Sequence, residues 1–211
     1  MISIIVAMDD NQLIGKKESS NGMPWNNSED LKHFKATTIN KTILMGYTTY
    51  MAIGRPLPNR KTIVVSFEPF DDERVEVRTS LTDVIQEYKD KNEDLFISGG
   101  ASIYKQSLPL ADQLLISRIP GAHVGETYFP DFDEYGFELQ ETIPYETFNE
   151  KRALLSEAPG VNQLARIGTK PGLVYERSTV APGSTSDYPE IGYNYTVSFD
   201  ITGAEENEGT E

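Results

Sequence analysis

The chain has 211 residues, of which 38% are hydrophobic and 25% charged, so it can fold as one cored domain with some additional chain. It contains no cysteine, which excludes disulfides, thiolate metal sites and a cysteine nucleophile, and which fits a reducing, cytoplasmic compartment. The net charge of −14 disfavours nucleic acid and anionic membranes as partners.

Two further absences narrow the function. His33 and His123 are the only histidines and stand far apart in the sequence, so no metal site is expected. The chain starts with a short apolar run at 2–7, which lacks the basic region and the length of a signal or membrane-spanning segment. We therefore interpret this run as a buried strand.

The first two-thirds of the chain alternate between strand-like and helix-like segments. Short apolar runs rich in β-branched residues predict strands, and the segments between them have helical spacing of apolar residues. This alternation predicts an α/β fold with a mainly parallel sheet, helices on both faces and ligands at the carboxyl ends of the strands. The expected strands are 2–7, 42–45, 62–66, 95–98 and 114–119, and the expected helices are 29–37, 48–53, 81–89 and 101–108.

The most informative run is residues 23–34, which begins as a turn and continues as a helix. Pro24 cannot continue a helix, and Ser28 is a suitable N-cap. Asp30 and Phe34 are four residues apart and so point the same way. The large apolar residues Trp25 and Leu31 stand close to them in the sequence. A carboxylate in such a place is either a first-turn acid that faces water or a buried group with a function.

Two strand-to-helix junctions contain glycine. Gly99 and Gly100 follow one expected strand, and Gly46 follows another, just before Thr48 and Thr49. Glycine lets the backbone approach a ligand closely, and a helix N-terminus binds phosphate. Taken alone, the Gly99-Gly100 junction is better explained as a tight turn, and Thr49 is equally well explained as an ordinary cap.

A rigid, proline-rich turn at 53–61 carries two arginines, Arg55 and Arg60. Arg60 stands just before a strand, where a fixed guanidinium can hold a carboxylate through two parallel hydrogen bonds. The alternative is a surface arginine that balances an acidic protein.

In combination, these motifs resemble the dihydrofolate reductase family, almost without gaps from residue 1 to about 137. The resemblance also includes Leu13-Ile14-Gly15, Gly54-Arg55-Pro56-Leu57-Pro58, Tyr104, Gly125-Glu126-Thr127 and Phe129-Pro130. It implies a dihydrofolate-reductase-like three-layer α/β fold, with a mostly parallel central sheet, helices on both faces and a C-terminal antiparallel hairpin. The implied reaction is hydride transfer from a nicotinamide dinucleotide to 7,8-dihydrofolate.

The resemblance also implies roles for individual residues. Asp30 would bind the 2-amino group and N3 of the pterin and assist protonation at N5 through water, and its burial should raise its pKa. The implied catalytic residues are Asp30, Trp25 and Ser117, the last at a position where the family usually has threonine. The implied substrate-binding residues are Ile5, Ala7, Leu31, Phe34, Lys35, Ile53, Arg55, Leu57 and Arg60, with Arg60 on the α-carboxylate of the glutamate tail. The implied cofactor-binding residues are Ala7, Ile14, Gly15, Gly46, Tyr47, Thr48, Thr49, Ser66, Phe67, Gly99, Gly100, Ala101, Ser102, Ile103, Tyr104 and Thr127.

The expected cofactor is NADPH, with NADH as the alternative. Family members that use NADPH commonly have an arginine at the position of Tyr47 and hydroxyl or basic residues at those of Phe67 and Glu68. Here all three positions lack positive charge, which predicts weaker discrimination in favour of NADPH. Arg78 or Lys61 is the alternative source of a phosphate contact.

The C-terminal third departs from the family. We expect a strand at 142–148 and a final strand at either 193–201 or 173–177. Residues 149–190 would then be an insertion or extension near the terminal hairpin. The whole is interpreted as one domain over 1–202, followed by an acidic tail at 203–211.

Two other functions remain open at this point. One is a reductase of the same fold that acts on another heterocycle, such as the pyrimidine reductase of riboflavin synthesis, although such proteins lack the spacing from Trp25 to Asp30 and the Arg60 position. The other is a non-catalytic nucleotide-binding module, which an intact Asp30 and Gly99-Gly100 disfavour. Expected partners are dihydrofolate and antifolates, and a monomer is expected, with a dimer as the alternative.

Overall fold

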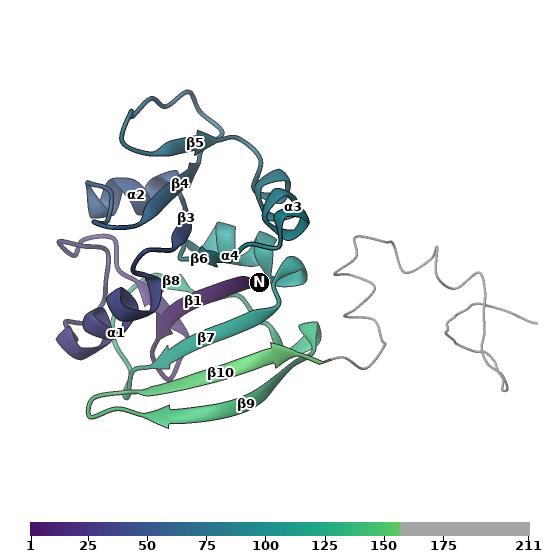
Figure 1. Cartoon of the computed structure of the whole chain (residues 1–211). Coiled ribbons are helices and arrows are strands. Elements are labelled where there is room, and N and C mark those ends of the chain that lie inside the picture. Colours follow the sequence, from purple (N-terminus) through teal and green to yellow (C-terminus); the bar gives the residue numbers. More distant parts are fainter. Residues whose placement is uncertain (157–211) are drawn as a thin grey trace, which may run out of the picture. The chain divides into compact units, whose positions relative to one another are not determined.

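The computed structural model describes residues 1–156. An eight-stranded sheet forms its centre, in the order β5-β4-β3-β6-β1-β7-β10-β9 (Figure 1). The candidate final strands at 173–177 and 193–201, and the acidic tail, lie outside the described residues.

The six strands from β5 to β7 in this order are mutually parallel, and β10 runs antiparallel to both β7 and β9. The sheet strands are β1 (Ile2–Met8), β3 (Thr42–Gly46), β4 (Lys61–Val65), β5 (Glu76–Arg78), β6 (Leu95–Ile97), β7 (Gln113–Arg118), β9 (Phe137–Pro144) and β10 (Asn149–Leu155). The helices are α1 (Ser28–Thr38), α2 (Tyr47–Ile53), α3 (Leu81–Lys91) and α4 (Ala101–Ser107), with short 3₁₀ turns η1 (Leu108–Leu110) and η2 (Asp133–Tyr135). A separate two-stranded ribbon joins β2 (Leu13–Gly15) to β8 (Thr127–Tyr128). Within residues 1–156, no helix has the length and apolar character needed to cross a membrane.

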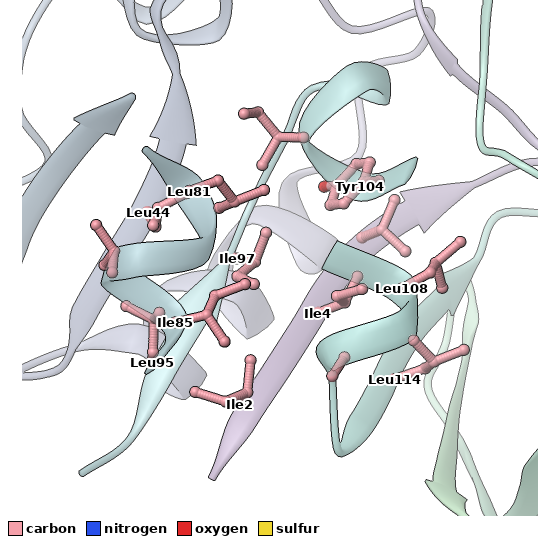
Figure 2. Packing of buried hydrophobic residues seen from close by; sticks show 14 of the residues in the cluster. Ile2, Ile4, Leu44, Leu81, Ile85, Leu95, Ile97, Tyr104, Leu108 and Leu114 are labelled. Carbon is pink, nitrogen blue, oxygen red and sulfur yellow. The ribbon is translucent and has the colours of Figure 1, made fainter. Parts of the chain in front are cut away.

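Alternation along the strands divides the core into two layers. Ile2 and Ile4 of β1 belong to the cluster that packs on α3 and α4, as Figure 2 shows for Ile85 and Tyr104. Ile5 belongs to the opposite cluster, which includes residues of α1 and α2. Because successive side chains of a strand point to opposite faces, each strand serves both layers. The expected three-layer α/β fold is confirmed.

The cap of α1 differs from the expectation. Asn27, not Ser28, precedes the helix in an extended conformation, and its side-chain oxygen accepts a hydrogen bond from the Asp30 amide at 2.9 Å. Asparagine caps helices at least as well as serine, so composition alone did not distinguish the two positions.

The C-terminal hairpin also differs from the expectation. The expected strand at 142–148 is divided, because β9 ends at Pro144 and a turn follows before β10 begins at Asn149. The first residues of the expected insertion at 149–190 therefore form a strand inside the sheet. The pattern was hard to read because β9 is an exposed edge strand, and because β10 buries Glu150, a charged residue.

Candidate active site

Asp30 lies in the first turn of α1 with only 6% of its surface exposed. Burial raises the pKa of its carboxyl group above the ordinary value of 3.8, while a hydrogen bond with the Ser117 side chain and the nearby His33 act in the opposite direction. When it is ionised, the carboxylate accepts a hydrogen bond from the Ser117 hydroxyl. The structure thus joins two of the residues assigned to catalysis, one from α1 and one from β7.

Four of the residues expected around a substrate share one apolar cluster on the α1 and α2 face of the sheet. Ile5 belongs to the core cluster on the α1 and α2 face of the sheet, and Phe34, Ile53 and Leu57 pack against that cluster. Ala7 and Ser117 are register partners in the pair β1–β7, two residues beyond Ile5 on the same face. An apolar wall with one buried acid suits a flat, donor-rich heterocycle.

Trp25 precedes α1, and Leu31 lies on α1 next to Asp30. The Trp25 indole nitrogen is buried and has no hydrogen-bond partner among residues 1–156, and its ring meets His123 edge-on at a centroid distance of 5.1 Å. Leu31, on α1 beside Asp30, is 49% exposed. An orphaned indole N–H is a donor that a ligand or a water molecule can satisfy.

Arg60 is held in place by two hydrogen bonds. Its Nη1 donates to the Thr38 hydroxyl at 3.0 Å and its Nε donates to the Pro58 carbonyl at 3.0 Å. Partial burial lowers the pKa of the Arg60 guanidinium from its very high ordinary value, and an arginine remains charged in proteins. Lys35 and Arg55 are both exposed, Lys35 on α1 and Arg55 in the segment after α2.

The two glycine junctions, one after β3 and one after β6, meet at the carboxyl ends of these strands. The Gly46 amide donates to the Gly99 carbonyl at 2.8 Å, and Gly99 has a φ of +120°, a conformation that side chains other than glycine disfavour. A Cβ added at Gly46 would lie 2.9 Å from Ile103, and one at Gly100 would lie 3.0 Å from the Thr49 hydroxyl. Close packing thus brings five residues together where β3 and β6 end, namely Gly46, Thr49, Gly99, Gly100 and Ile103.

Neither helix that starts at this point has a side-chain cap. Gly46 precedes α2 and Gly100 precedes α4, and neither helix receives a cap hydrogen bond from a side chain. Tyr104 of α4 donates its buried hydroxyl to the Ile5 carbonyl at 2.9 Å, and burial raises its pKa. The first N–H groups of both helices are thus presented beside the strand ends, next to Thr48, Ala101 and Ser102.

Gly15 of β2 lies close to β8. A Cβ there would come within 3.1 Å of the Thr127 Cβ, and the Glu126 amide donates to the Gly15 carbonyl at 3.3 Å. Ile14 packs against the core. The Glu126 carboxylate accepts from the Lys17 amide at 3.3 Å, which ties the loop after β2 to the loop before β8.

The far end of this cofactor region is aromatic and acidic. Tyr47 contacts Phe70 at a centroid distance of 5.0 Å, which places the start of α2 beside the loop that carries Phe67 and Glu68. Phe67 is 74% exposed, and the Ser66 hydroxyl donates to the Glu68 carbonyl at 2.8 Å.

The nearby cations are already engaged in ion pairs. Arg78 contacts Glu76 at 3.0 Å and Glu87 at 2.9 Å, and Lys61 contacts Glu76 at 3.1 Å. Neither alternative source of a phosphate contact is therefore free of an acidic neighbour.

Sequence reasoning missed the contacts between the hairpin tip and α1. Thr147 donates to the Asn27 side chain at 3.0 Å and to Glu29 at 3.1 Å, and the Glu146 amide donates to Glu29 at 3.0 Å. The only sequence signal for contacts between α1 and the hairpin was His33, which lies three residues after Asp30 and so on nearly the same helix face. Its ring packs against Tyr145 of the hairpin tip. Its partners are distant in sequence, so no local pattern revealed them.

A second histidine contact was also missed. Asp9 is fully buried at the end of β1, and its Oδ2 accepts from the His123 amide at 2.7 Å and lies 3.3 Å from the His123 ring. Backbone hydrogen bonds outweigh burial and lower the Asp9 pKa. In the described part of the chain, no group of three or more histidines and acids is arranged to hold a metal ion.

Comparison with known proteins gives a consistent result. The family model described as dihydrofolate reductase matches residues 1–156. Dihydrofolate reductase of Bacillus subtilis is 43% identical over 140 residues, which cover 66% of this chain and 81% of the relative. Dihydrofolate reductase type 3 of Salmonella typhimurium is 42% identical over 142 residues, covering 67% and 85%. The structure of dihydrofolate reductase from Enterococcus faecalis, complexed with NADP(H) and RAB-propyl, superposes with a TM-score of 0.67 at 33% identity, covering 73% of this chain and 95% of that one.

Proposed function

The chain belongs to the dihydrofolate reductase family, and from this premise we infer that it reduces 7,8-dihydrofolate to tetrahydrofolate with NADPH. The observation that supports this activity most directly is the buried Asp30 carboxyl, bonded to Ser117 beside an apolar wall. The overall reaction consumes one hydride and one proton for each dihydrofolate. The family membership and this site together disfavour the pyrimidine reductase and the non-catalytic module.

Asp30 orients the pterin and controls its proton. Its ionised carboxylate accepts hydrogen bonds from the 2-amino group and N3. Burial raises its pKa, which favours the protonated form that would deliver a proton through water to N5. Ser117 fixes the carboxylate, and the orphaned Trp25 N–H can hold the delivering water. Ile5, Phe34, Ile53 and Leu57 exclude bulk water from the reacting ring.

Arg60 binds the glutamate tail of the substrate in this proposal. Its Nη1 and Nε are used by the hydrogen bonds to Thr38 and Pro58, and within residues 1–156 the structure shows no partner for Nη2. Because the guanidinium is already held in place, binding a carboxylate costs little further side-chain conformational entropy.

The residues around the glycine junctions fit a dinucleotide. The Cβ positions of Gly46 and Gly100 are closed by neighbouring atoms, and uncapped N–H groups face the same region. We propose that these amides and the hydroxyls of Thr48, Thr49 and Ser102 bind the phosphates. Ala7, Ile14, Gly15, Thr127 and the α4 residues Ala101, Ile103 and Tyr104 would complete the site. When bound, the nicotinamide supplies the hydride.

Discrimination between NADPH and NADH should be weak. Tyr47, Phe67 and Glu68 carry no positive charge, and Arg78 and Lys61 are ion-paired with acids. A 2′-phosphate at the adenosine end would lie near the acidic Glu68, and neither Arg78 nor Lys61 would be free of an ion pair to bind it. A preference for NADPH above about a hundredfold in kcat/KM would contradict this proposal.

The test of the activity is the loss of NADPH absorbance when dihydrofolate is added. The wild-type protein should turn over, and Asp30→Asn should bind NADPH but lose most turnover. Full activity in Asp30→Asn would contradict the assignment of Asp30. No turnover by folded wild-type protein would contradict the function itself.

We also propose that antifolates compete at the Asp30 site, that the protein acts as a cytoplasmic monomer, and that nucleic acid is not a partner. The net charge of −14 supports the last point, because like charges repel. Competition between an antifolate and dihydrofolate, and the mass in solution, test the others.

A further inference from the structure

Asp9 is a fully buried acid, directly after β1, that has no part in the proposed mechanism. Its Oδ1 accepts hydrogen bonds from the Asn11 amide at 2.8 Å and the Leu13 amide at 3.0 Å, and its Oδ2 accepts from the His123 amide at 2.7 Å. A buried carboxylate is stable only where donors satisfy its oxygens, and these three donors are all main-chain groups. Asp9 therefore joins the turn between β1 and β2 to the loop between β7 and β8.

The bond from Asp9 also fixes the position of the His123 side chain. Because it reaches the main-chain amide, it holds residue 123 whatever the charge of the ring. Arg118 holds the same point from the main-chain side, since its Nη1 donates to the Asp9 carbonyl at 2.8 Å. The His123 ring meets the Trp25 indole edge-on, with a centroid distance of 5.1 Å and an interplanar angle of 65°, which is a favourable aromatic geometry. A distant loop, anchored by a buried acid, thus supplies a wall for Trp25.

Trp25 stands just before the helix that carries Asp30. It is two residues before Asn27, whose side chain accepts from the Asp30 amide at 2.9 Å. Its indole N–H is buried and has no hydrogen-bond partner within residues 1–156. A buried donor without an acceptor costs free energy, which a ligand or an ordered water molecule can recover. The direction of this N–H therefore matters, and the ring packed against the indole limits its rotation.

We propose that Asp9 and His123 are positioning residues for the reaction. Asp9 holds His123, and the His123 ring holds the Trp25 indole in the orientation that presents its N–H to the substrate or to its ordered water. This inference rests on the proposed function, in which that N–H serves the reacting ring. It does not depend on the charge of the histidine, because another aromatic ring would form the same edge-on contact.

The first test is the fluorescence of Trp25, which is the only tryptophan in the chain. His123→Ala removes the ring, so the emission of the ligand-free protein should shift to longer wavelength and acrylamide should quench it more strongly. His123→Phe restores an aromatic edge and should keep the emission and quenching of the wild type. Unchanged emission in His123→Ala, or equal changes in the two variants, would overturn the proposal.

Two neighbouring acids separate the contact with His123 from general anchoring of the loop. Asp9→Asn leaves one carbonyl oxygen for donors on two sides, so it should shift the emission as His123→Ala does, and the double variant should show no further shift. Asp10 ties down the same loop through the Gly121 amide, at 2.9 Å, so Asp10→Ala is the matched control and should leave the emission in place. A shift in Asp10→Ala as large as that in His123→Ala would contradict the specific role of the ring. The His123 side chain is 28% exposed, so the His123 variants decide the question even if Asp9→Asn does not fold.

The second test is the rate of hydride transfer in a single turnover, when protein with bound NADPH is mixed with dihydrofolate. This rate reports the chemistry separately from product release. His123→Ala should lower it by about 3- to 30-fold, because a small displacement of a positioned group has a large effect on rate, and His123→Phe should restore most of it. The dissociation constant for NADPH should change by less than about twofold in both variants. A loss of NADPH affinity with unchanged hydride transfer would show that the contact serves binding of the cofactor and would overturn the proposal.

These outcomes separate the inference from the proposed function. A folded wild-type protein with no dihydrofolate turnover would contradict the function, while the fluorescence of the ligand-free variants would still test the contact between His123 and Trp25. Normal turnover in the wild type with an unchanged single-turnover rate in His123→Ala would contradict only the positioning role.

Discussion

The two ends of the proposed ligand site are built in opposite ways. At the substrate end, Asp30 is buried, its amide is bound by Asn27 at the cap of α1, and its carboxyl group is hydrogen-bonded to Ser117 of β7. At the adenosine end, Phe67 is 74% exposed, and Arg78 is already bound to acids. The contrast supports the proposal that specificity is concentrated at the substrate end and that discrimination between cofactors is weak at the adenosine end. The following predictions test this contrast.

The largest effect should come from Asp30→Asn. The amide keeps the shape of the side chain but cannot ionise or relay a proton at neutral pH, so kcat/KM for dihydrofolate should fall by about 10²- to 10⁴-fold. Steady-state kinetics measures the fall, and NADPH binding by fluorescence is the control, which should be unchanged. A loss below tenfold would mean that the substrate end is not organised around this acid.

The second effect concerns the glutamate tail. Arg60→Lys replaces a planar fork with a point charge and breaks the contacts with Thr38 and Pro58. The KM for dihydrofolate should rise by about 10- to 100-fold, with kcat nearly unchanged. A dihydropterin without the glutamate tail is the matched control, because its kinetics should not respond. An equal loss with both substrates would contradict the role of Arg60.

The adenosine end should respond by gaining function. Tyr47→Arg adds an unpaired cation beside the Phe67 loop, and kcat/KM with NADPH should rise about tenfold while that with NADH stays the same. Glu68→Gln should add a smaller gain in the same direction. If the arginine leaves the ratio of NADPH to NADH unchanged, the 2′-phosphate does not lie at this place.

A smaller effect should appear in stability at the cap of α1. Asn27→Ala removes the acceptor for the Asp30 amide and for Thr147, and it should lower the free energy of unfolding by about 1 kcal/mol. Urea denaturation measures the change. Ser28→Ala is the matched control, because Ser28 does not cap the helix in the structure.

The last prediction has a sign that depends on pH. Because the folded-state pKa of Asp30 is raised, its ionisation costs stability above the ordinary value of 3.8, and this cost disappears as the pH falls below that value. Asp30→Asn should therefore be more stable than the wild type at neutral pH and lose that advantage in acid. Thermal unfolding over the pH range tests this, and a destabilised variant at neutral pH would contradict the burial argument.

The central part of the fold was predictable from the sequence because local patterns encode it. A continuous run of apolar, β-branched residues identified β1, and helical spacing of apolar residues identified α3. Short strands such as β5 and β2 were missed because three residues carry too little periodicity. The edge strand β9 was misplaced because it is mostly exposed and has no apolar face to recognise.

The sequence by itself determined the identity of the acid at Asp30, the glycine junctions at Gly46 and Gly99, and the lack of positive charge at Tyr47. Each is a residue type at a recognisable local position. Only the tertiary structure decided that Glu150 is buried against His33, that Asn27 rather than Ser28 caps α1, and that Arg78 is ion-paired. The physical reason for the first is that His33 and Glu150 lie more than a hundred positions apart and share no local pattern. For the other two, the sequence offers several suitable partners nearby, and only the folded geometry selects among them.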